Sequence, residues 1–161
     1  MCAALNGLDE CVSDIRNAYL QPPSPQNHEI ICGSEFDLEN VGKKALIRRE
    51  LYFGKATVSN FQNHLRVCMQ HLDFASCLEE SDVWMKPAKK SERSEYYEYF
   101  LLDTDDVLVV SKIGEKLLRE GIVRYFELKK EYIGSPQIYL GGHVRKVELE
   151  NGPKAWAFIS S

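Results

Sequence analysis

The chain has 161 residues, of which 44% are hydrophobic and 27% are charged, a size and balance typical of one globular domain with its own core. The formal net charge of −4 excludes a protein that holds nucleic acid by overall positive charge, although the basic strip at residues 43–50 leaves local phosphate contacts open. No apolar run approaches the length of a transmembrane helix, which argues against a membrane partner.

Cysteine usage indicates a reducing compartment. The five cysteines are an odd number and include no CxxC pair, and no charged-then-apolar leader precedes Asp9. A secreted protein held together by disulfides is therefore not expected. We expect reduced thiols in an intracellular chain, cytoplasmic or nuclear, that is not secreted.

The first half of the chain is predicted to supply one core strand and one core helix. Residues 5–14 favour a strand, followed by a short helical turn that the Pro-rich residues 21–26 end. Residues 28–33 and 43–52 indicate two further short strands. Apolar side chains then recur at three- and four-residue spacing, which predicts an amphipathic helix over residues 57–72.

The second half is predicted to supply a hairpin, a helix and a last core strand. Residues 82–87 indicate an edge strand that ends at Pro87, and a charged loop is expected over 87–95. The remaining elements are, in order, strands over 96–102 and 107–110, a helix over 112–126, a strand over 138–148, and a closing hairpin around the Asn-Gly pair at 151–152.

These elements follow the order of a split β-α-β-β-α-β, or ferredoxin-like, fold. We therefore predict a single α+β domain over residues 1–161, with extra short strands and a C-terminal hairpin. A right-handed crossover makes the first two core strands parallel, and the hairpin reverses the third. The end of the first core strand then lies beside the start of the third.

This topology brings together acidic residues that are far apart in the sequence. Asp14 ends the first strand, and Asp105 and Asp106 begin the third. Carboxylates that converge at a sheet edge repel one another unless a cation neutralises them. Oxygen ligands of this kind suit Mg²⁺ or Mn²⁺, and a pair of such ions promotes phosphoryl transfer. Two other interpretations stay open, a solvated hairpin turn at residues 103–106 and a helix N-cap at Asp14.

Four segments in one order support this chemistry. They are DIRNAYL (14–20), LYFGKATVSNF (51–61), DVWMKPA (82–88) with YYEYFLLDTDD (96–106), and IYLGGHV (138–144). Together they resemble the palm of the reverse transcriptases of copia-type retrotransposons: the first-Asp motif, the second motif, the run into the Tyr-x-Asp-Asp hairpin, and the Leu-Gly strand. The resemblance covers nearly the whole chain and implies a polymerase palm fragment.

The resemblance implies an RNA-directed DNA polymerase. Asp14, Asp105 and Asp106 would bind Mg²⁺ or Mn²⁺ and catalyse two-metal transfer of deoxynucleotides to a primer 3′ end. Tyr19 would stack under the sugar and reject a 2′-hydroxyl, and Lys55 would lie along the templating base and the incoming nucleotide. The implied partners are an RNA or DNA template with its primer, and deoxynucleoside triphosphates.

Departures from the family pattern predict little or no activity of the isolated chain. Asp103 stands where the hairpin of the family carries Tyr, and Phe53 stands where the second motif has Gly. The chain is also truncated relative to the family, without fingers, thumb or ribonuclease H. The alternative that stays open is a non-catalytic nucleic-acid-binding domain, or a decayed remnant, of the same split α+β fold.

Two further patterns admit a structural explanation as well as a functional one. His64, Cys68 and His71, with Cys77 after them, are a conceivable zinc set, but Cys68 also belongs to the apolar stripe of the predicted helix. The glycines at 141–142 either allow close approach of a nucleic-acid backbone or mark a strand kink.

Overall fold

The computed structural model describes residues 3, 6–35, 38–51, 56–91, 94–148, 150, 152 and 154–160. The chain forms two compact units, unit 1 from residues 1–16 and 66–161 and unit 2 from residues 17–65. The single domain over residues 1–161 stays a prediction, because two compact units can belong to one folding domain or to two.

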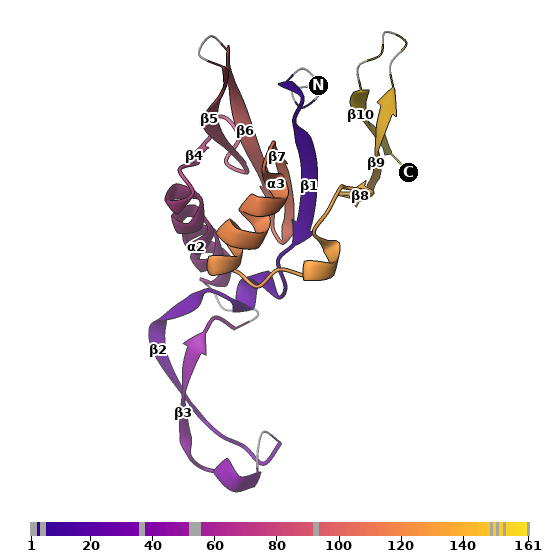
Figure 1. Ribbon diagram of the computed structural model, residues 1–161. Helices are drawn as coiled ribbons and strands as arrows, with labels where there is room; N and C mark the ends of the chain where they lie inside the picture. Colours follow the sequence, from indigo (N-terminus) through magenta and orange to yellow (C-terminus); the bar gives the residue numbers. More distant parts are fainter. Residues whose placement is uncertain are drawn as a thin grey trace. The chain divides into compact units, whose positions relative to one another are not determined.

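The elements are labelled as in Figure 1. The strands are β1 (Asp9–Asp14), β2 (Pro23–Ile31), β3 (Lys44–Arg49), β4 (Ala75–Ser76), β5 (Val83–Ser91), β6 (Ser94–Asp103), β7 (Asp106–Ser111), β8 (Ile138–Tyr139), β9 (Gly142–Glu148) and β10 (Lys154–Ser160). The helical elements are η1 (Ala18–Leu20), η2 (Leu38–Asn40), α2 (Thr57–His71), α3 (Gly114–Lys116), η3 (Leu117–Gly121), η4 (Ile122–Arg124) and η5 (Lys130–Tyr132).

The fold is α+β, as predicted, and its sheets are antiparallel. The five-stranded sheet of unit 1 has the order β1-β7-β6-β5-β4 (Figure 1). β1 pairs with β7 from Asp9 opposite Ser111 to Asp14 opposite Asp106. The predicted placement of the first core strand beside the third is therefore confirmed.

The two faces of this sheet differ in burial because alternate residues of a strand point to opposite sides. On β1, Cys11 and Ser13 are buried, whereas Val12 and Asp14 are partly exposed. α3 begins over the buried face, where the missing side chain of Gly114 lets the helix approach Cys11 closely. The large, fully buried side chains of unit 1 include Ile15, Cys68, Met69, Phe100, Val107, Val109, Leu118, Ile122, Phe126 and Leu128.

The helical segment after β7 changes its period along its length. One α-helical turn, α3, is followed by the π-helical turn η3 and the 3-10 turn η4. Leu118 and Ile122 are fully buried and Phe126 is 1% exposed, so the segment keeps one side toward the core. No helix in the described part of the chain combines the length and apolar composition needed to cross a bilayer.

This segment begins later than the predicted span of 112–126. The hydroxyl oxygen of Ser111 accepts a hydrogen bond from the backbone N–H of Ile113 at 2.9 Å, which favours a turn before Gly114. The helix therefore starts two residues after the expected position.

β5 is longer than predicted and lies inside the sheet. It continues past Pro87, which lies opposite Tyr97 of β6, so the predicted strand end at Pro87 and the predicted loop over 87–95 are wrong. The short strand β4 pairs with β5 at Trp84 and Met85. Pro87 lies beyond that pairing, where a residue without an N–H donor is tolerated.

The predicted core strand over 138–148 is also wrong. Leu140 and Gly141, with φ angles of 46° and 77°, form a tight turn that separates β8 from β9. Both strands join β10 in a separate three-stranded sheet of order β10-β9-β8. The expected hairpin around residues 151–152 is confirmed by the β9–β10 pairing. The ferredoxin-like arrangement is not confirmed, because its last strand is outside the five-stranded sheet.

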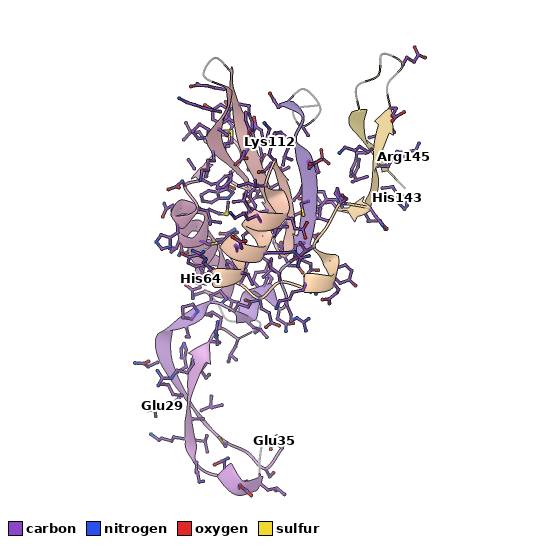
Figure 2. All side chains as sticks on the ribbon, in the orientation of Figure 1. Glu29, Glu35, His64, Lys112, His143 and Arg145 are labelled. Carbon is purple, nitrogen blue, oxygen red and sulfur yellow. The ribbon has the colours of Figure 1, made fainter. Side chains whose placement is uncertain are left out.

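Unit 2 contains β2, β3 and the first part of α2. β2 and β3 pair antiparallel, which confirms the two short strands predicted there. Lys44 Nζ on β3 lies 3.0 Å from a carboxylate oxygen of Glu29 on β2; Glu29 is labelled in Figure 2.

At the start of α2, the buried carboxylate of Glu50 accepts hydrogen bonds from Asn60 (2.8 Å) and Thr57 (3.3 Å). An anion is favourable at a helix N-terminus.

Replacement of Gly142 by Val is expected to loosen the β8–β10 sheet. A Cβ at Gly142 would overlap the ring of Phe158, which would have to move at a cost of about 1 kcal/mol. Hydrogen exchange should therefore accelerate at the β9 and β10 amides. Gly134→Ala is the matched control, because a Cβ at Gly134 meets nothing within 4 Å. Equal exchange in the two variants would contradict the proposed packing.

Candidate functional site

Three aspartates form one row across three neighbouring strands of unit 1. Asp14 on β1 lies opposite Asp106 on β7, and Asp106 lies opposite Asp103 on β6. Directly opposed residues of antiparallel strands share a face of the sheet, with Cβ atoms about 5 Å apart. This aspartate row (Asp14, Asp106 and Asp103) lies on the face that also carries Val12, opposite the face under α3.

Asp105 lies beside the aspartate row, in the turn between β6 and β7. The turn is tight, and Thr104 adopts a left-handed φ of 56°. The backbone N–H of Ile15 donates to the carbonyl oxygen of Asp105 at 2.8 Å, which ties the turn to the end of β1. The structure thus brings the three predicted aspartates, Asp14, Asp105 and Asp106, to one end of the sheet.

A lysine from the distal part of the chain neutralises this end of the sheet. Lys129 Nζ donates to Asp14 Oδ2 at 2.7 Å. Both side chains are partly buried, with 35% of Lys129 and 25% of Asp14 exposed. The hydrogen bond to Asp14 is the largest cause that raises the pKa of the Lys129 ammonium, so the lysine is held in its charged form.

The position of Asp106 in the row disfavours ionisation of its carboxyl group. Burial is the largest cause that raises the pKa of its carboxyl above the ordinary value. The neighbouring carboxylates of Asp105, Asp14 and Asp103 raise this pKa further, in that order, whereas Lys129 lowers it. Like charges this close disfavour full ionisation of the group.

A cavity of about 450 Å³ opens beside the aspartate row, a volume in the range of small-ligand sites. Asp14, Asp106 and Glu131 give it an acidic lining, and Tyr132 and Tyr139 add aromatic rings. Burial raises the pKa of Tyr139 to about 12, with further contributions from acidic neighbours that include Asp106. The Tyr139 hydroxyl therefore stays protonated and can donate a hydrogen bond.

One oxygen of Asp14 lacks a donor. Asp14 Oδ1 is buried and finds no hydrogen-bond partner among the described residues, while Oδ2 is bound by Lys129. An unsatisfied buried acceptor costs on the order of 1–3 kcal/mol, and a cation is one way to compensate it. The donor set therefore fits Mg²⁺ or Mn²⁺ in charge and atom type. Among the described residues, no group of three His, Cys, Asp or Glu side chains is arranged to hold a metal ion. This also applies to the conceivable zinc set of His64, Cys68, His71 and Cys77.

The other predicted site residues lie outside unit 1 or outside the described residues. Tyr19 lies in unit 2, within η1, and its ring packs edge-on against Phe61 with centroids 5.4 Å apart. Lys55 and Phe53 lie outside the described residues. The glycine pair at 141–142 belongs to the β8–β9 turn and the start of β9, which agrees with its structural interpretation.

Sequence reasoning missed Lys129 and Tyr139. Lys129 meets Asp14 across 115 residues, and no local spacing indicates such a pair. The available signal was the acidic excess at residues 103–106, which requires a nearby cation, together with the two lysines at 129–130. Tyr139 is the second residue of the strand predicted over 138–148, and nothing in the neighbouring residues indicates that it lies near carboxylates.

Comparison with known proteins gives a distant, partial relative. The sequence matches no protein-family model. It is similar to Protein Ycf2 of Huperzia lucidula, with 25% identity over 113 residues. The match covers 66% of this chain but only 5% of that protein.

This finding overturns the predicted family. The similarity is to Protein Ycf2 and not to a reverse transcriptase, so membership of the copia-type retrotransposon enzymes is wrong. The motif likenesses are short, and they do not extend to a relationship over the chain. The roles given to Tyr19 and Lys55 came from that resemblance alone and stay predictions.

Asp106→Asn is expected to stabilise unit 1 at neutral pH. A raised carboxyl pKa means that the contribution of Asp106 to stability is present below the unfolded pKa and is lost as the pH rises through the folded pKa. Because the carboxyl is partly exposed, solvent screening limits the gain to roughly 0.5 kcal/mol. Thermal unfolding should show the gain at pH 7 and none at pH 3. Glu79→Gln, an exposed charge removal, is the control.

Lys129→Met is expected to destabilise unit 1, because it leaves the partly buried Asp14 carboxylate without its cation. The loss should be about 1 kcal/mol of unfolding free energy, discounted for exposure. Urea denaturation measures it, with Lys130→Met, at the exposed neighbouring lysine, as the control. Equal losses in the two variants would show that the ion pair adds no stability.

Proposed function

We propose that unit 1 binds a divalent cation, Mg²⁺ or Mn²⁺, at Asp14, Asp105 and Asp106 and uses it to bind and transfer phosphate-bearing ligands, nucleotides or nucleic acid. The observation that carries the proposal is the orphaned Asp14 Oδ1 at the end of the aspartate row. Paired strands and the tethered Asp105 turn hold the carboxylates in place. When bound, the cation would supply Lewis-acid stabilisation of phosphate oxygens.

The residues of the chain would each contribute to ligand binding. The carboxylates of Asp14, Asp105 and Asp106 would hold the cation, and the position of Asp14 and Asp106 at the cavity of about 450 Å³ would direct a ligand into it. The Tyr139 hydroxyl, kept protonated by its raised pKa, would donate a hydrogen bond to the ligand. Acidic walls repel a bare phosphate, so ligand binding would depend on the cation.

The proposal also covers the fold of unit 1 and the cellular location of the protein. We propose that unit 1 is a ferredoxin-like, palm-type core whose last strand has moved into the separate sheet; the β1-β7-β6 order and the helices α2 and α3 support it. We also propose an intracellular, cytoplasmic or nuclear, location. The four described cysteines, Cys11, Cys32, Cys68 and Cys77, are free, which supports a reducing compartment.

A second candidate is nucleic-acid binding without catalysis. Lys129 already neutralises Asp14, and the described carboxylates are not arranged as a complete metal-binding group. A domain with this arrangement could bind without a cation. In that case binding of nucleic acid would be insensitive to chelators.

Cation-dependent nucleotide binding tests the proposal. The native chain should retain a labelled deoxynucleoside triphosphate in Mn²⁺ but not in EDTA, because the acidic cavity repels phosphate. Asp105→Asn should weaken retention at least tenfold, an order-of-magnitude expectation for loss of one charged ligand. Glu79→Gln should match the native chain.

Two outcomes would contradict the proposal. Equal retention by Asp105→Asn and the native chain would exclude Asp105 from the cation site and so contradict the proposed three-aspartate set. Retention of a labelled oligonucleotide in EDTA, without Mn²⁺-dependent binding of the triphosphate, would favour the second candidate.

A further inference from the structure

The backbone around Lys129 is fixed to the end of β1. The N–H of Lys129 donates to the carbonyl of Asp14 at 2.9 Å, and the N–H of Arg16 donates to the carbonyl of Glu127 at 2.9 Å. Between these bonds, Ile15 and Leu128 form a bridge, and both side chains are buried, at 0% and 2% exposure. The Lys129 side chain can therefore change position while its backbone stays in place.

Neighbouring charges direct the Lys129 ammonium to Asp14. Two glutamates of the same segment, Glu127 and Glu131, pair with Arg16 at 3.3 and 3.8 Å. Those carboxylates are therefore already compensated. The ring of Tyr132 lies 6.0 Å from Lys129 Nζ, so a weak cation–π attraction acts on the ammonium in the position where it binds Asp14.

The ammonium and a divalent cation compete for Asp14. Lys129 holds Oδ2 at 2.7 Å, and a cation at Oδ1 or Oδ2 would lie within a few ångströms of the ammonium. Repulsion between a double and a single positive charge at that distance is strong in a partly buried site. Binding of a divalent cation therefore weakens the hold of Asp14 on the ammonium.

We infer that Lys129 is the resident counter-ion of Asp14, and that it leaves this carboxylate when a divalent cation binds. The inference rests on the proposed cation site and adds its regulation: the ion pair holds the Asp14 side chain in place without metal, and it lowers the affinity for metal. Lys129 is thus a positioning residue, and its ammonium leaves Asp14 Oδ2 upon exchange.

Lysine labelling of the native chain tests the exchange directly. An N-hydroxysuccinimide ester acylates free amines, and an ion-paired ammonium reacts slowly. The acylation rate of Lys129, read by peptide mass spectrometry, should rise on addition of Mn²⁺, while that of exposed Lys130 should not change. An unchanged rate at Lys129 under Mn²⁺ that is shown to be bound would overturn the inference.

Mn²⁺ binding by three variants, followed by electron paramagnetic resonance, provides the second test. Lys129→Met should bind Mn²⁺ roughly five- to tenfold more tightly than the native chain, because a competing charge is gone. Lys129→Arg, which keeps the charge, and Lys130→Met should bind like the native chain. Circular dichroism establishes that each variant is folded.

The outcomes separate the inference from the proposed function. Mn²⁺ binding by the native chain with no tighter binding by Lys129→Met overturns the inference and leaves the cation site intact. Binding by Lys129→Met alone supports the inference in its strongest form. No Mn²⁺ binding by the native chain or by any variant overturns the proposed function and the inference with it.

Discussion

The ion pair between Lys129 and Asp14 is the interaction on which the acidic end of the sheet depends. Register fixes Asp14, Asp106 and Asp103 in one row, and strand pairing allows none of them to move away. Without a cation the row would combine desolvation with mutual repulsion. Lys129 supplies that cation, and the pairing of its backbone with Asp14 brings the segment after the helices to the edge of β1. The cavity beside the row exists because this segment is held there.

The sequence predicted the elements whose periodicity is strong and local. The amphipathic α2, the alternating strands β6 and β7, and the antiparallel placement of β1 all follow from side-chain spacing and chain topology. The failures have two physical causes. Pro87 reads as a strand end, but the neighbouring strand β4 is too short to require its missing N–H. Leu140 adopts a left-handed conformation that leucine rarely favours, so the only local signal for the turn that diverts β9 into another sheet was the glycine pair at 141–142, which admitted a strand kink.

The part of the site that depends on strand order was predicted from the sequence. The meeting of Asp14 with the 105–106 pair follows from strand order alone, without any family knowledge. Lys129 was beyond this reasoning, because a pair across 115 residues depends on the path of the chain after the helices. The family prediction failed for a different reason. Short runs of similar residues can match a motif without the extended similarity that shared descent leaves. The relative found is Protein Ycf2, at 25% identity.

The π-helical turn η3 has a consequence for how this chain tolerates changes in length. Leu118, Ile122 and Phe126 are four residues apart and are all buried, whereas a regular α-helix rotates each residue by about 100° and would carry such a series gradually around its axis. The wider turn offsets that drift. Loss of one residue between Leu118 and Ile122 would restore a regular helix in which these two side chains are three residues apart and still share a face. The extra residue that the π-helical turn accommodates can therefore be lost without turning the buried side chains out of the core.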